Sequence, residues 1–350
     1  MAVRGGRRAR LADPLPVGDA SVELARDLAL HGARAALPDH EPENLEEFDG
    51  RLPFWGVPSG RIDAARALLY LCREADAVNS DVLASVAELA HDPHPTVRWS
   101  VARWLGLARH ADEEWTWALV DRLAQNEPSA QVREALLHTI GRFVSDQLDR
   151  AAATARAMYE REAHGSRHES LLRALAQFLV GLWIWRGEHH GRALVDEWAS
   201  DIESEAGLVR NVLASPRDPV THGDDGDEHT AIRGRAIDAW ADVSRAAGEA
   251  FHRFSERHRA GEALSDDEQG SLREVAQLLD TAASEFYFAS GSYAEKHKSP
   301  NERLAPEKRE RFIVKPNQFS TCSCRSACRR SLIICLRHSQ ASSRSTRAAC

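Results

Sequence analysis

The chain has few of the residues and turn signals that build β-sheets. Thr, Tyr and Ile are scarce, the Asn-Gly dipeptide typical of hairpins is absent, and Ala, Leu, Arg and Glu dominate the 350 residues. These four residues are good helix formers, whereas strands favour β-branched and aromatic residues. The composition therefore predicts an all-α fold.

The chain also lacks apolar runs of membrane-spanning length. Its most apolar stretch, 178–185, is far shorter than the ~20 residues that a spanning helix needs. The basic start, residues 1–18, is not followed by the apolar segment of a secretory signal. We therefore expect a cytoplasmic protein with no membrane partner.

Signatures of common enzyme classes are missing as well. The chain contains no G-x-x-x-x-G-K-[ST] phosphate loop, no H-E-x-x-H, no G-x-S-x-G and no dinucleotide fingerprint. This absence favours a non-catalytic protein that uses no cofactor.

Positive charge is scarce outside the last residues of the chain. The net charge is −8, but residues 319–350 hold six Arg and no acid, which leaves 39 basic against 53 acidic groups, or −14, in the rest. Nucleic-acid binding usually needs a basic face. The charge balance therefore argues against a nucleic-acid partner, although it leaves room for a local basic stripe.

Cysteine is nearly confined to the same last residues, which hold five of the six. Cys322, Cys324, Cys328 and Cys335 follow a C-x-C-x₃-C-x₆-C spacing, which lacks the paired knuckles of structural zinc sites. We interpret this segment as a disordered tail without a metal. One hypothesis is that it arises from a shifted reading frame.

Two further groups have the residue types of metal ligands. The first lies in the segment 214–229 and comprises His222, Asp224, Asp225, Asp227, Glu228 and His229. It does not follow the EF-hand order, so we interpret it as a solvated loop. The second is Glu188, His189 and His190, whose adjacent side chains point to different sides of a helix. We interpret this group as a helix start, so no metal site is predicted.

A short phrase recurs along the chain: a branched apolar residue, usually followed by Arg. Its copies are Val97-Arg98, Val132-Arg133, Leu172-Arg173 and Val209-Arg210, with Ile62-Asp63 as an earlier one, at steps of 35, 35, 40 and 37 residues. The segments 91–106 and 126–141 also share an acid-Pro pair, Asp92-Pro93 and Glu127-Pro128, and a final Gly. A repeat of roughly 20–50 residues is typical of a solenoid.

The repeat and the breaks in its pattern predict the domain organisation. Six parts are expected: a flexible arm at 1–20, an N-terminal cap at 21–60 plugged by Phe54 and Trp55, repeats at 61–213, an acidic loop at 214–229, a C-terminal helical cap at 230–295, and a linker with a disordered tail at 296–350. Apolar spacing predicts helices at about 130–144 and 147–163, then at 169–187 and 190–202. Longer helices are expected up to 259 and at 271–289.

The repeat resembles the HEAT (armadillo-like) family. The first copy matches that family through Asp92, Pro93, Val97, Arg98, Ala102 and Leu105, and the second matches through Pro128, Val132, Arg133 and Ala135, with Glu127 in place of Asp. The match is good over 61–145 and extends to about 213, with a period shorter than the ~40–47 residues of HEAT units. The resemblance implies a right-handed α-solenoid of helix pairs.

A second resemblance covers residues 97–132. This segment is similar to helical regions of the large bacterial signalling ATPases of the STAND/NACHT type. It implies a sensor or an interaction segment of a larger bacterial signalling protein, since the chain contains no phosphate-binding loop of an ATPase domain.

Two residue types are candidates for binding a partner. Trp99 and Trp117 lie off the main apolar stripes, so they could serve as binding residues, although large aromatics more often fill the core. The repeated arginines, Arg98 and Arg133 with Arg173 and Arg210, could line a groove. In HEAT-like arrays the matching Arg usually pairs with an acid of a neighbouring repeat, and Asp92 and Glu127 recur at the same period. That structural interpretation is favoured.

These observations lead to a function hypothesis with alternatives. The leading hypothesis is a non-catalytic HEAT-like scaffold that binds a protein partner. The alternative is a nucleic-acid-binding HEAT-like protein such as an alkylbase DNA glycosylase, in which Asp112 or Glu113 near Trp115 would serve as the acid. Bilin lyases with similar repeats share only the fold, which does not by itself carry function.

Overall fold

The computed structural model describes residues 20–36, 59–73, 78–165, 167–213 and 226–289. Every regular element in these ranges is a helix, as the composition predicts. Several predicted features lie outside the described residues: the arm before residue 20, Phe54 and Trp55, the loop residues 214–225, and the tail with its cysteines. None of the described helices is long and apolar enough to cross a lipid bilayer.

The chain divides into two compact units, Met1–Leu179 and Val180–Cys350. The division falls inside one helix, α8 (Glu169–Arg186), and inside the segment 61–213 that the sequence predicts as one array.

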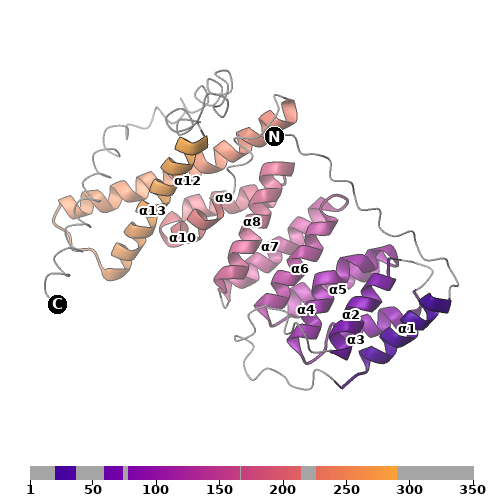
Figure 1. The fold of residues 1–350 in the computed structure, drawn as a ribbon. Coiled ribbons are helices and arrows are strands. Elements are labelled where there is room, and N and C mark those ends of the chain that lie inside the picture. Colours follow the sequence, from indigo (N-terminus) through magenta and orange to yellow (C-terminus); the bar gives the residue numbers. More distant parts are fainter. Residues whose placement is uncertain (1–19, 37–58, 74–77, 166, 214–225, 290–350) are drawn as a thin grey trace, which may run out of the picture. The chain divides into compact units, whose positions relative to one another are not determined.

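The described part of the first unit contains eight further helical elements, which Figure 1 colours from indigo to pink. They are α1 (Ala20–Ala33), α2 (Gly60–Leu71), α3 (Ser80–Leu89), α4 (Pro95–Trp104), the 3₁₀ helix η3 (Leu105–His110), α5 (Glu113–Asn126), α6 (Ala130–Phe143) and α7 (Leu148–His164). The bounds of α6 and α7 agree with the predicted ranges to within about a residue.

Polar residues fix the starts of the helices in the first unit. The side chains of Asn79, Asp112 and Ser129 accept hydrogen bonds from backbone N–H groups in the first turns of α3, α5 and α6. Pro95 opens α4, where its missing N–H costs nothing because the first N–H groups of a helix have no partner within it. The loops before α4 and α6 are therefore held in defined positions, and these loops build the site described below.

Helices pack both on the next helix in the chain and on the one after it. α2 packs on α4 and α4 on α6, while α5 packs on both α6 and α7. Apolar side chains fill the space between them, including the fully buried Leu68, Leu136 and Ile140. A buried hydrogen bond of 2.7 Å, from the Thr139 hydroxyl to the Ala102 carbonyl, joins α6 to α4. The result is a layer of α2, α4 and α6 with α5 and α7 against it.

The helix that begins at Pro95 is shorter than its apolar pattern predicts. The stripe from Val97 to Ala108 has the spacing of a single α-helix, yet α4 ends at Trp104 and continues as η3. At this point Gly106 donates its N–H to the Thr139 hydroxyl, 3.3 Å away. A side chain on Gly106 would meet Arg142 Cδ at 3.2 Å, so α6 approaches the backbone here closely.

The described part of the second unit contains the end of α8 and four further helices. These are α9 (His189–Ser200), α10 (Ile202–Leu213), α12 (Asp227–Arg259) and α13 (Asp266–Ala289). α12 packs on α9, α10 and α13, and its core face carries Trp240, Phe251 and Phe254. The longer helices agree with the prediction for this region, where α12 ends at the predicted residue and α13 begins earlier than expected.

Candidate functional site

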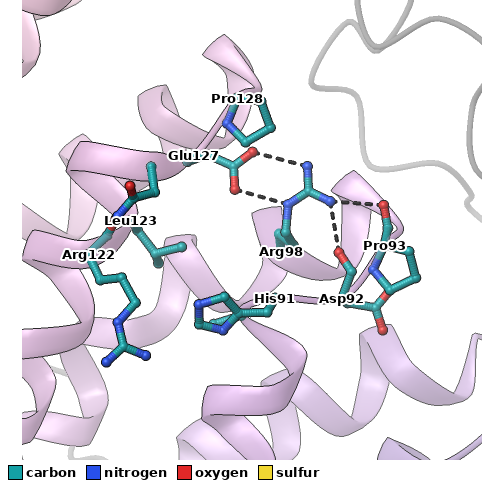
Figure 2. Close-up of a pocket in the computed structure, with 10 residues that line it drawn as sticks. His91, Asp92, Pro93, Arg98, Arg122, Leu123, Glu127 and Pro128 are labelled. Carbon is teal, nitrogen blue, oxygen red and sulfur yellow. Dashed lines mark hydrogen bonds and ion pairs between the residues drawn. The ribbon is translucent and has the colours of Figure 1, made fainter.

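Arg98, near the start of α4, lies with its guanidinium buried between two loops. Its Nε and Nη2 donate to the two carboxylate oxygens of Glu127, at 2.9 and 3.1 Å. Its Nη1 donates to the carbonyls of Asp92 and Pro93, at 2.8 and 2.9 Å, as Figure 2 shows. Only 9% of the Arg98 side chain and 2% of the Glu127 side chain are exposed. This two-bond arrangement is the strongest geometry for an Arg–carboxylate pair.

A similar pair, with one hydrogen bond to the carboxylate instead of two, recurs 35 residues further along the chain. Arg133 Nη2 donates to Glu162 Oε2 at 2.7 Å, and Nη1 donates to the Glu127 carbonyl at 3.4 Å. Both side chains of this pair are buried. In each pair the acid follows the arginine by 29 residues. Glu127 therefore binds Arg98 with its side chain and Arg133 with its backbone.

An earlier pair extends the series toward α2. Arg61 Nε lies 2.7 Å from Asp92 Oδ2, and Asp92 Oδ1 accepts the His94 N–H at 2.8 Å. Glu127 likewise accepts the N–H two residues further on, that of Ser129. We call Arg61–Asp92, Arg98–Glu127 and Arg133–Glu162 the arginine–carboxylate ladder. Asp92 and Glu127 also hold the loops in which they lie, whereas Glu162, near the end of α7, holds the segment that follows by accepting the His168 N–H.

Burial and hydrogen bonds set the charge states at the end of the ladder. Burial alone would raise the pKa of Glu162, but hydrogen bonds from the His168 N–H and ring, at 2.5 and 2.8 Å, together with Arg133, hold this pKa below its usual value. Burial lowers the pKa of Arg133, while Glu162 opposes that change. A guanidinium stays protonated in a protein, so the pair remains ionic at neutral pH.

A cavity of about 360 Å³ opens beside the ladder, between the ends of α3 and α5. Its lining residues are Ala90, His91, Asp92, Pro93, Arg98, Arg122, Leu123, Asn126, Glu127 and Pro128. The ladder residues on its wall have their charges paired, so the accessible polar groups are those of the exposed His91, Arg122 and Asn126. The cavity can accept a polar chain segment against an apolar floor at Ala90 and Leu123.

A second hollow, a groove of about 450 Å³, lies between α5 and α7. Small residues form much of it, among them the exposed Ala153 and Ala157 of α7. Charged side chains stand at its rim: Arg150 Nη2 donates to Asp121 Oδ2 at 3.1 Å, and Arg161 donates to the Ala124 carbonyl at 3.1 Å. The cavity and the groove share α5, so together they extend across three helices.

The two predicted binding tryptophans do not line these hollows. Trp117 is fully buried, with its ring centroid 4.5 Å from that of Phe143 and the Arg150 guanidinium 4.6 Å from its ring. It is therefore a core residue and offers no surface to a partner. The expectation that Trp117 lies off the apolar stripe and could bind a partner is wrong. Trp99 is half-buried in α4.

The structure places the four repeated arginines in three different environments. Arg98 and Arg133 belong to the buried ladder, whereas Arg173 is exposed on α8. Arg210 pairs with Glu274 of α13 at 3.1 Å. It lies near the end of α10, whereas Arg98 and Arg133 lie near the starts of their helices.

The apolar residues of the phrase share one environment. They are buried in every copy that the sequence paired with Arg: Val97, Val132, Leu172 and Val209.

The acids suggested for base excision serve the start of α5. Asp112 accepts the Trp115 N–H at 2.9 Å as the N-cap, and Glu113 accepts a hydrogen bond from Gln147. Both acids are exposed, and neither lines the cavity or the groove. Their positions give no support to a glycosylase site.

Glu188, His189 and His190 form the start of α9, as the sequence predicts. Glu188 accepts the His190 N–H at 3.0 Å, and the two imidazole rings lie 4.1 Å apart rather than on different sides. Their ligand atoms all lie within 4.8 Å of one another, which is compatible with a metal ion. However, the carboxylate already caps the helix, and the N-terminal end of a helix dipole disfavours a cation.

The cysteine in the described part of the chain is Cys72, which is buried. Burial raises the pKa of its thiol to about 11, so it is protonated at neutral pH. A buried thiol in this state is a core residue and not a nucleophile.

Two members of the ladder, Arg61 and Glu162, were not predicted from the sequence. No Pro follows Glu162, so the acid-Pro signature does not mark it. The signal that could have found it is the step of 35 residues from Asp92 to Glu127 and again to Glu162.

Comparisons with models of known protein families, with curated proteins and with solved structures found no match to this chain. The HEAT-like resemblance therefore rests on the residues named above.

Proposed function

We propose that this chain is a non-catalytic scaffold that binds an extended segment of a partner protein along α3, α5 and α7. The observation that carries the proposal is the pair of adjacent hollows, about 360 and 450 Å³, that share α5. A chain of shallow hollows across successive helices suits an extended peptide better than it suits a small substrate, which usually binds in one deep pocket.

The proposed architecture is a HEAT-like, right-handed α-solenoid in the first unit. Support comes from the packing of α2 on α4 and α4 on α6, and from the two ladder pairs with the same 29-residue separation. Solenoids use the surface that successive repeats create to bind partners. In this role the chain would act as an interaction piece of a larger signalling assembly in the cytoplasm.

The groove between α5 and α7 allows a direct test. In the variant Ala153→Arg with Ala157→Arg, two long side chains fill the groove at exposed helix positions. Arg is a good helix former, so we expect the fold to be kept. Affinity capture of the full chain from its native cells, read by mass spectrometry after nuclease treatment, should recover one protein at constant stoichiometry with the parent chain and lose it with this variant.

A matched control separates the groove from a change in charge. Ala118→Arg with Ala193→Arg adds the same two charges at exposed positions of α5 and α9 that line neither hollow. The control should retain the partner. Equal recovery with both variants, or a captured protein that nuclease releases, would contradict the proposal.

A further inference from the structure

The exposed side of α4, η3 and α6 gathers four basic side chains from three elements. Arg103 comes from α4, Arg109 from η3, and His138 and Arg142 from α6. Within the described residues only Arg109 has a carboxylate partner, Asp146 at 3.1 Å. We call these four residues, with Tyr70 and Trp104, the basic patch. Unlike the ladder, the patch presents two guanidiniums, those of Arg103 and Arg142, that no described carboxylate neutralises.

The basic groups of the patch lie close enough to lower one another's pKa. Burial lowers the pKa of His138 and that of Arg142, and Arg103 lowers both further. His138 is therefore neutral at neutral pH, and the arginines carry the charge of the patch. Arg109 adds to the repulsion at Arg142 and also donates to the Arg142 carbonyl at 3.2 Å. Holding like charges together costs free energy that a bound anion would recover.

Aromatic rings lie among these cations. The Trp104 ring is 5.3 Å from the Arg142 guanidinium and 5.5 Å from the Tyr70 ring, and Tyr70 is 43% exposed. Arg, Trp and Tyr are the residues most enriched at the centres of protein–protein interfaces. The patch therefore combines unpaired charge with flat apolar surface.

Basic residues also continue beyond the patch at a regular position. Arg66 of α2, Arg103 of α4, His138 of α6 and Arg173 of α8 follow one another at steps of 37, 35 and 35 residues. All four are exposed or half-exposed. Arg66, Arg103 and His138 each lie five residues after a ladder arginine, so they occupy equivalent positions on α2, α4 and α6.

We propose that the basic patch binds a carboxylate-rich segment of a partner protein. The chain as a whole carries a net charge of −8, so the basic patch is a local exception to an acidic balance. A basic surface confined to one place favours a short anionic ligand. Duplex DNA carries one charge per ~1.7 Å, and the acidic remainder of the chain would repel such a polyanion. Separate guanidiniums, in contrast, suit separate carboxylates, each of which one Arg can bind with two hydrogen bonds.

This proposal does not depend on the groove between α5 and α7. The patch residues lie on α2, α4, η3 and α6, and the groove residues lie on α5 and α7. Filling the groove should leave binding at the patch unchanged, and reversing the charge of the patch should leave the groove open. The two proposals therefore fail separately.

The test uses the full chain and a fluorescein-labelled peptide of alternating Glu and Gly, read by fluorescence anisotropy. We expect saturable binding at low salt that weakens at physiological salt, because ions screen exposed charges over about 8–10 Å. Arg103→Glu with Arg142→Glu should weaken binding by about ten-fold or more, since it replaces attraction by repulsion. Arg103→Gln with Arg142→Gln should give a smaller loss and guards against misfolding of the first variant.

The control variant carries the same change of charge elsewhere. Arg245→Glu with Arg259→Glu alters two exposed residues of α12 and should bind the peptide as the parent chain does. Circular dichroism checks that all variants are folded. Three results would overturn the proposal: no saturable binding by the parent chain, equal loss in the control, or tighter binding of a single-stranded oligo-dT of similar charge that the patch variant abolishes.

Discussion

Glu127 shows how one residue joins two neighbouring repeats. Its carboxylate accepts two hydrogen bonds from Arg98, and its backbone carbonyl accepts one from Arg133. Removing one partner of a buried ion pair leaves the other charge unpaired in the interior, whereas replacing both by apolar groups can be neutral. The ladder therefore sets how the helix pairs fit together more than how stable they are.

This asymmetry gives a prediction for Arg98. Arg98→Ala should lower the free energy of unfolding by about 3–5 kcal/mol, because it strands the Glu127 carboxylate. The double variant Arg98→Met with Glu127→Met should recover most of that loss. Urea unfolding followed by circular dichroism measures both. If Arg98→Ala is as stable as the parent chain, then leaving the Glu127 carboxylate unpaired costs no free energy and the prediction is wrong.

The lowered pKa of Glu162 predicts how stability depends on pH. A carboxyl with a lower pKa in the folded state stabilises the fold fully above its unfolded pKa of about 4.5, and this contribution is lost as the pH falls below that value. The free energy of unfolding should thus decrease as the pH falls from about 5 to 3. Glu162→Gln, although less stable overall, should show a shallower decrease over that range. Identical slopes would contradict the assignment.

Part of the site could be predicted residue by residue. The period of Asp92 and Glu127 indicated that acids of neighbouring repeats pair with the repeated Arg, and the structure pairs Arg98 with Glu127. The burial of Trp117 could not be predicted in this way, because its neighbours Phe143 and Arg150 come from the next two helices. A helical wheel of one segment contains no information on such contacts.

At the level of helices, the predicted starts and ends of α6 to α9 both lie within two residues of the observed ones, whereas α13 begins five residues before its predicted start. Pro95 and the N-cap Asp112 mark the starts of α4 and α5 in the sequence itself. The end of α4 at Trp104 depends on a hydrogen bond from Gly106 to Thr139, a residue 33 positions away. Interactions over such distances along the chain lie outside any local pattern.

The contact between α1 and α2 offers a test at this level. A Cβ on Gly60 would lie closer to the Ala35 side chain than real Cβ atoms approach, so the two segments touch through a glycine. Gly60→Ala should separate them and raise the hydrogen-exchange rate of the α1 amides. Gly248→Ala in α12, where a Cβ meets nothing within 4 Å, should instead stabilise its helix by up to ~1 kcal/mol. Unchanged exchange in α1 would rule out the close contact.

For the whole molecule, the composition indicated the all-α class, and the recurring phrase indicated that helices pair. The division at Leu179 was not visible in the sequence, because the phrase continues through Leu172 and Val209 without a break. The difference between the two units is seen in the partners of the repeated arginines. Arg133 pairs with an acid 29 residues later, whereas Arg210 pairs with α13.

The two-sided bonding of Asp92 and Glu127 gives the stretch between them matching ends. Excision of residues 93–127 would join Asp92 directly to Pro128, and Arg133 would then follow Asp92 at the same interval as Arg98 does now. Arg61 would keep Asp92, and Arg133 would keep Glu162. Outside the ladder, Arg150 would lose Asp121 and Asp146 would lose Arg109, so a shortened chain would need new partners for these charges.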